Sequence, residues 1–101
     1  MKNTMIALAT AGLISFGSAA TAGDATAGQA AYATCVGCHG AAGEGGVGPK
    51  LAGQSAADVA AKLNAYKAGE QVGPMTSMMA PMAAGLSDSD IANIAAYTAA
   101  M

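Results

Sequence analysis

The feature that most constrains this chain is the run Cys35-Val36-Gly37-Cys38-His39, which holds both cysteines and the single histidine of the sequence. The spacing Cys-x-x-Cys-His is typical of covalent c-type haem attachment. Two thiols placed in this way can add to vinyl groups on neighbouring rings of the porphyrin, and the next imidazole then lies under the iron. The motif therefore predicts one covalent haem c, with Cys35 and Cys38 as thioethers and His39 as an axial ligand.

Three other interpretations of the motif fit the rest of the chain poorly. A thioredoxin-like redox pair is expected within a βαβ pattern, which the sequence lacks. A structural zinc site needs four ligands, and besides carboxylates the chain offers two cysteines and one histidine. A disulfide across so short a loop would be strained and would leave His39 without a role. Haem attachment is the interpretation that uses all three residues.

The first 22 residues have the pattern of an export signal. Lys2 supplies a positive charge, an apolar stretch follows over residues 5–16, and small residues fill positions 17–22. A membrane span needs about 20 apolar residues, and this stretch is shorter. We therefore expect cleavage after Ala22, which leaves a single domain over residues 23–101 in an oxidising compartment.

The expected domain is too small and too poor in large side chains to fold around a core of its own. Tyr32, Tyr66 and Tyr97 are its aromatic residues, because Phe16 lies in the expected signal and the sequence has no tryptophan. Small domains of this kind usually need a metal, disulfides or a cofactor. Haem would supply the apolar bulk that is missing.

The charge balance argues against one class of function. The whole chain has four basic and six acidic residues and a formal net charge of −2. Because phosphate recognition needs a concentrated basic surface, this balance argues against nucleic-acid binding as the function.

The pattern along the chain predicts an all-α fold with three main helices. Asp24 can cap a helix from Ala25 to about Cys35, Ser55 can cap one over residues 56–67, and Ser87 can cap one from Asp88 to about Ala100. Glycines crowd residues 37–53, which indicates a loop. In the methionine-rich segment 73–82, Pro74 and Pro81 disfavour helix at the residues that precede them, so we expect an interruption there. No stretch alternates as a strand would.

Several motifs together resemble the bacterial class I c-type cytochromes, particularly the small monohaem kind similar to one half of the dihaem periplasmic cytochromes. The matching stretches are Gly28-x-x-x-Tyr32-x-x-Cys35-x-x-Cys38-His39-Gly40, Gly48-Pro49-Lys50-Leu51-Ala52-Gly53-Gln54, Tyr66-Lys67-Ala68-Gly69, Leu86-Ser87-Asp88, Ile91-Ala92 and Ala95-Ala96-Tyr97. They extend over essentially all of residues 23–101.

The resemblance implies an arrangement and a ligand set. The first and last helices would cross where Gly28 and Tyr32 meet Ile94 and Tyr97. The carbonyl of Pro49 would accept a hydrogen bond from the second nitrogen of His39 and so fix the ring. Met79 would be the other iron ligand, with Met78 as second choice. The three methionines that are not ligands among Met75, Met78, Met79 and Met82 would pack against the haem, because methionine readily fills irregular cores. The alternative is that all four only pack there.

The function implied is that of a periplasmic electron carrier rather than an enzyme. Such a protein exchanges single electrons with redox proteins such as a quinol-oxidising complex, a dehydrogenase, a terminal oxidase or a reductase, as a monomer without stable membrane insertion. A second hypothesis is a haem subunit of a periplasmic oxidoreductase complex, or a gas-binding haem protein. Gln54 and Tyr66 would either bind haem propionates or simply complete the second helix and its loop.

Overall fold

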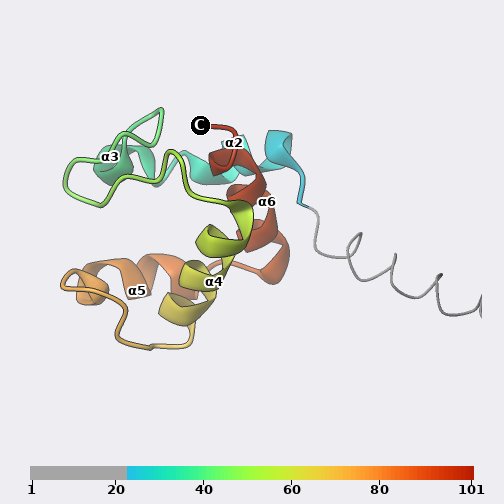
Figure 1. Ribbon diagram of the computed structural model, residues 1–101. Helices are drawn as coiled ribbons and strands as arrows, with labels where there is room; N and C mark the ends of the chain where they lie inside the picture. Colours follow the sequence, from blue (N-terminus) through green and yellow to red (C-terminus); the bar gives the residue numbers. More distant parts are fainter. Residues whose placement is uncertain (1–22) are drawn as a thin grey trace, which may run out of the picture.

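The computed structural model describes residues 23–101, so the predicted export signal and its cleavage point lie outside the described residues. Within this range the structure has helices and no strand, as predicted (Figure 1). The helices are α2 (Ala25–Tyr32), α3 (Val36–His39), α4 (Ala56–Lys67), α5 (Thr76–Ala84) and α6 (Asp88–Thr98). None of the helices in residues 23–101 has the length and apolar character that crossing a membrane requires.

The first and last described helices, α2 and α6, cross closely (Figure 1). At the crossing, a Cβ atom added to Gly28 would overlap the backbone carbonyl of Asn93 and lie 2.9 Å from Cβ of Tyr97. The rings of Tyr32 and Tyr97 pack with centroids 5.5 Å apart and planes tilted by 55°. The crossing that the resemblance implied is therefore present, and it explains a glycine that would otherwise weaken the middle of a helix.

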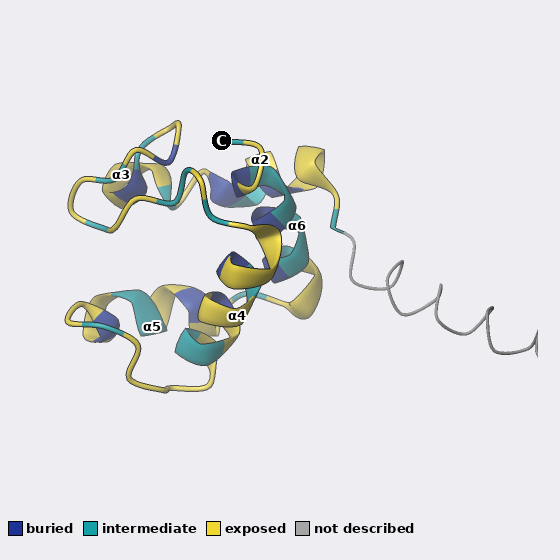
Figure 2. Cartoon of the chain, in the orientation of Figure 1, coloured by how far each residue is buried: buried dark blue, intermediate teal, exposed yellow. Residues whose placement is uncertain are grey.

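The core lies where α4 packs against this crossing. Figure 2 shows the buried residues on the facing sides of α2, α4 and α6. The buried apolar cluster consists of Tyr32, Val59, Leu63, Ile91, Ile94 and Ala95. In α4 and α6 these residues recur at helical spacing, which gives each helix one apolar face and leaves the opposite face to solvent.

Side-chain caps set the starts of the long helices. The Asp24 carboxylate accepts from the backbone amides of Thr26 and Ala27 at the start of α2. The Ser55 hydroxyl accepts from the amide of Asp58, and α4 has the predicted bounds. Ser87 and Asp90 form a complete capping box at the start of α6. Each cap satisfies amides that the helix itself leaves unpaired.

One expectation was wrong, because the methionine-rich segment contains a helix, α5, with Pro81 inside it. Thr76 organises its start: its hydroxyl accepts from the amides of Val72 and Gly73 and donates to the carbonyl of Gly73. Proline removes a hydrogen bond to the carbonyl four residues earlier, which here belongs to the exposed Ser77 and can be hydrated. Packing of α5 on α4, with Ala83 fully buried, outweighs the local preference.

The first helix is also shorter than predicted. It ends at Tyr32 rather than near Cys35, and after a turn the chain forms the short helix α3. Cys35 stands at the N-cap of α3, and its carbonyl accepts from the amide of His39 at 2.9 Å. The attachment motif therefore lies in a separate one-turn helix rather than at the end of α2.

Candidate functional site

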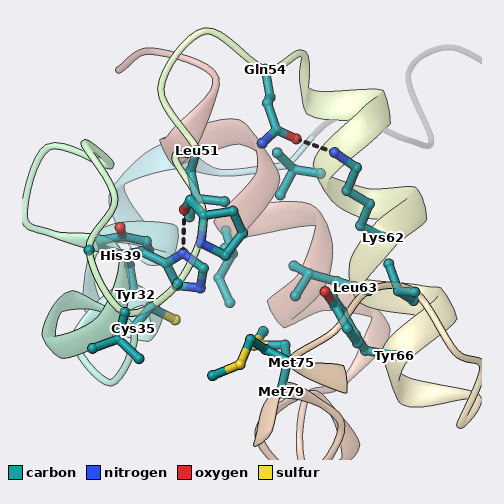
Figure 3. A pocket seen from close by; sticks show the side chains of 18 of the residues that line it. Tyr32, Cys35, His39, Leu51, Gln54, Lys62, Leu63, Tyr66, Met75 and Met79 are labelled. Carbon is teal, nitrogen blue, oxygen red and sulfur yellow. Dashed lines mark hydrogen bonds between the residues drawn. The ribbon is translucent and has the colours of Figure 1, made fainter. Parts of the chain in front are cut away.

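A cavity of about 470 Å³, here called the main cavity, opens between α3 and its following loop on one side and α4 and α5 on the other. Its wall includes His39, Lys62 and Met79, and Figure 3 shows this wall from close by. A smaller cavity of about 180 Å³, the side cavity, adjoins it and shares His39, Met75 and Met79 with it. The volume of the main cavity falls in the range of about 300–1,000 Å³ usual for cofactor sites.

His39 is held in one orientation. The residue is 8% exposed, and its Nδ1 lies 2.8 Å from the carbonyl oxygen of Pro49. With that carbonyl as acceptor, Nδ1 carries the proton and Nε2 keeps its lone pair. Figure 3 shows the second ring nitrogen facing the cavity, on the side of the methionines. The arrangement is that of a metal-ligating histidine whose outer nitrogen is fixed by a backbone carbonyl.

The loop after α3 brings Pro49 to the imidazole. The carbonyl of His39 accepts from the amide of Gly45, and the carbonyl of Cys38 accepts from the amide of Gly48, both at 2.8 Å. A Cβ atom added to Gly48 would lie 2.6 Å from Cε1 of His39. Gly48 thus lets the backbone pass directly against the ring.

The two cysteines border the side cavity. Cys35 is half-buried and Cys38 exposed, and no disulfide joins them. Burial raises the pKa of the Cys35 thiol, and a hydrogen bond between Thr34 and Cys35 only partly offsets this rise. Redox-active Cys-x-x-Cys pairs instead rely on a lowered pKa. The environment of Cys35 therefore lacks the lowered thiol pKa that a redox-active pair would need.

Four methionines on and beside α5 face the two cysteines across the side cavity. Met75 and Met79 also line the main cavity, whereas Met78 and Met82 do not. Met79 packs against the buried core, while the other three are 40–54% exposed. Met75 and Met79 are one helical turn apart on the same face. The structure therefore groups Met75, rather than the predicted second choice Met78, with Met79.

These residues fit a covalent haem. An imidazole with a free Nε2 and a thioether stand on walls of one cavity, two thiols lie at its edge, and the remaining lining is largely apolar. This donor set, histidine with methionine, is one that cytochromes c use for haem iron. Cys35 and Cys38 would hold the group by its vinyl carbons, and the cavity would exclude water from its faces.

Comparison with known proteins decides the family. The cytochrome c family model matches residues 25–101. The chain belongs to the cytochrome c family. Cytochrome c-554(548) of Halomonas halodenitrificans is 50% identical to this cytochrome over 78 residues, which cover 75% of this chain and 94% of that protein. Cytochrome c-554(547) of Halothiobacillus neapolitanus is 43% identical over 90 residues, or 79% of this chain and 99% of that protein.

A longer relative matches in part. Cytochrome c4 of Pseudomonas aeruginosa is 44% identical over 86 residues, which cover 82% of this cytochrome but 41% of the longer protein. Together the matches confirm the predicted family, the all-helical class and the covalent haem c, for which Cys35 and Cys38 supply the Cys-x-x-Cys-His motif. The protein is a haem-based electron carrier that exchanges electrons with redox partners.

Sequence reasoning missed three residues of the site. Gly48 was noted only as part of a matching motif, although its closeness to His39 makes it part of the ligand's setting. Met75 was expected only to pack against the haem. Lys62 belongs to none of the motifs found in the sequence, yet it lines the main cavity. Helical spacing could have grouped Met75 with Met79, but nothing in the sequence brings Lys62 to the cavity.

Proposed function

We propose that this cytochrome shuttles single electrons between redox proteins of the periplasm through a haem whose iron is ligated by His39 and Met79. The observation that carries the proposal is the pairing of an oriented imidazole with a core-packed thioether on walls of the same cavity. The haem iron supplies the chemistry, because it alternates between two oxidation states. The protein's part is to hold that iron in one environment in both.

Each ligand residue is braced by the surrounding chain. The Pro49 carbonyl fixes the tautomer and the plane of the His39 ring. Met79 sits within α5, and its amide donates to the carbonyl of Met75 at 3.1 Å. A rigid pair of ligands keeps the reorganisation that accompanies electron transfer small. A neutral thioether also favours the reduced metal, which raises the reduction potential.

With His39 and Met79 both holding the iron, no position on it would be left for a substrate, which supports a carrier rather than an enzyme. Electrons would instead pass at the haem edge. Around the side cavity the surface is apolar, with Val47 62%, Met78 54% and Met82 48% exposed. Such a rim suits brief contact with quinol-oxidising complexes, dehydrogenases, oxidases or reductases.

The proposed location rests on the sequence. Residues 1–22 would be removed after Ala22, which frees residues 23–101 as one cytochrome c domain acting as a monomer. Attachment of haem to Cys35 and Cys38 also removes both thiols from exchange in an oxidising compartment. Mass spectrometry of the exported protein would test both points, since it should give the mass of residues 23–101 plus one haem. A retained leader would contradict the proposed cleavage.

Substitution of the methionines tests the ligand assignment. In the oxidised haem-loaded protein, Met79→Ala should abolish the near-infrared charge-transfer band of methionine-ligated ferric haem, because the thioether is gone. The matched variant Met78→Ala should keep that band. Wild-type protein should also fail to bind carbon monoxide in its reduced form. The reverse pattern for the two variants would overturn the choice of Met79, and carbon monoxide binding by the wild type would favour a gas-binding protein.

A further inference from the structure

One edge of the main cavity carries polar side chains. Gln54, Lys62 and Tyr66 line it, whereas Gln54 and Lys62 do not reach the side cavity, where Cys38 lies. In Figure 3, Gln54 and Lys62 stand on the opposite side of the cavity from Cys35. The main cavity thus has the thiol of Cys35 at one edge and the ammonium group of Lys62 at the opposite edge.

Gln54 holds that ammonium group in place. Lys62 Nζ donates to Gln54 Oε1 at 2.9 Å, and Gln54 Nε2 donates to the carbonyl of Lys50 at 2.7 Å. Lys50 directly follows Pro49, whose carbonyl meets His39. The segment that orients His39 is therefore connected through Gln54 to the ammonium group of Lys62 on α4.

The positive charge of Lys62 is not neutralised by its hydrogen-bond partner, because Gln54 is an uncharged amide. Asp58, one turn earlier on α4, forms no ion pair with Lys62 in the described part of the chain, where the ion pair found is Lys67 with Asp88 at 3.8 Å. Lys62 therefore places a positive charge, with no carboxylate paired to it, at the edge of a cavity whose wall is mostly apolar. An anionic group entering this edge would find its counter-charge here.

The chemistry of haem supplies such a group. Its vinyl carbons and its two carboxylate-bearing propionates lie at opposite edges of the porphyrin. Attachment to Cys35 and Cys38 fixes the vinyl edge at the thiol side of the cavity. The propionates must then lie toward the other side, where Lys62 and Gln54 stand.

We propose that Lys62, held by Gln54, is a positioning residue that pairs with a haem propionate and raises the reduction potential of the iron. A nearby positive charge favours the reduced haem, which carries one positive charge fewer than the oxidised form. The proposal rests on the proposed function, since it requires haem seated between His39 and Met79. It adds a determinant of the potential that lies outside the axial ligands.

The test measures the reduction potential of haem-loaded protein by spectroelectrochemistry at fixed pH and low salt. Lys62→Gln should lower the potential, which corresponds to an equilibrium constant for reduction about two- to fivefold smaller, the size expected for a partly solvated charge pair. Lys62→Arg should restore most of the difference, because the charge is kept. Lys67→Gln removes an equal charge from the same helix outside the cavity and should leave the potential close to that of wild type.

The near-infrared methionine band is recorded on every variant, so that the two proposals fail separately. An unchanged potential in Lys62→Gln, with the band retained, would overturn the role of Lys62 and leave the ligand assignment intact. An equal fall in Lys62→Gln and Lys67→Gln would also overturn it, because the effect would then be one of overall charge. Absence of the band from wild type would instead refute methionine ligation.

Discussion

Two glycines mark two differently built regions of this cytochrome. Gly28 lies where α2 crosses α6, and Gly48 lies where the loop after α3 passes His39. Both admit a close approach, but Gly28 meets backbone whereas Gly48 meets an imidazole. Figure 2 shows buried residues concentrated at the helix crossing, while much of α5 and of the loop is exposed. The crossing is held by the protein's own contacts, and the cavity wall is arranged to receive a cofactor.

From this difference we expect substitutions in one region to lower the free energy of unfolding and substitutions in the other to alter the spectrum and potential of the haem. Residues at the crossing contribute to the free energy of unfolding through packing. Residues on the cavity wall contribute mainly through the group they hold, so their substitution should appear first in spectrum and potential.

The largest effect on folding should come from Gly28→Ala. Alanine normally stabilises a helix relative to glycine by about 1 kcal/mol, but here the methyl group would force α2 away from Asn93. We expect a net loss of about 3 kcal/mol in the free energy of unfolding, measured by denaturant titration of haem-loaded protein. Gly37→Ala, at a position with no atom within 4 Å of the added carbon, is the matched control. Equal stability of the two variants would contradict the crossing.

Gly48→Ala should affect mainly the haem site and less the helix crossing. The new methyl group would lie 2.6 Å from Cε1 of His39, so the ring must move or the loop must yield. We expect a changed haem spectrum and a loss of about 1–3 kcal/mol, with helix content retained. Gly46→Ala, where the added carbon lies 3.4 Å from the Cys38 carbonyl, should change the spectrum little. An unchanged spectrum in Gly48→Ala would show that the loop, not the ring, adapts.

Tyr32→Phe should have an intermediate effect, because Tyr32 connects the two regions. Its hydroxyl donates to the carbonyl of Gly40 at 2.7 Å, directly after His39, while its ring packs at the crossing. Burial raises the pKa of Tyr32, which keeps the donor proton in place. Loss of this hydrogen bond should cost about 1–2 kcal/mol in unfolding titrations. A variant as stable as wild type would mean that water replaces the bond without cost.

The smallest of these effects is expected for Ser87→Ala, which removes half of the capping box of α6. The loss should be about 1 kcal/mol, with no change in spectrum or potential, because neither residue of the cap lines a cavity. Ser89→Ala, at an exposed position two residues after Ser87, is the control. A shift in potential would contradict the separation between the two regions.

The long helices could be predicted from the sequence because local signals and packing agree there. The bounds predicted for the second main helix, residues 56–67, are those of α4, and the expected Ser87 start of the last helix is that of α6. α5 escaped prediction because Pro74 and Pro81 argue against a helix locally, while its reason to form is contact with α4. α3 is too short to produce a periodic pattern of its own.

The site was predictable in its chemistry and less so in its geometry. The spacing of Cys35, Cys38 and His39 identifies them as haem-binding residues. The resemblance to the family implied the contact between His39 and Pro49, which the structure contains. The choice of Met79 is still a prediction, although its neighbours on the cavity wall are now known. The position of Lys62 depends on how α4 lies against the loop, which spacing along one helix does not encode.

The dual role of Tyr32 should couple unfolding of the helix crossing to unfolding of the haem site. Because one side chain anchors both the helix crossing and the turn behind His39, loss of either should release the other. Melting followed by circular dichroism and by the colour of the haem should then give superimposable curves with a single midpoint. The haem spectrum would change only as the helices unfold, although the haem itself would stay bound to the chain.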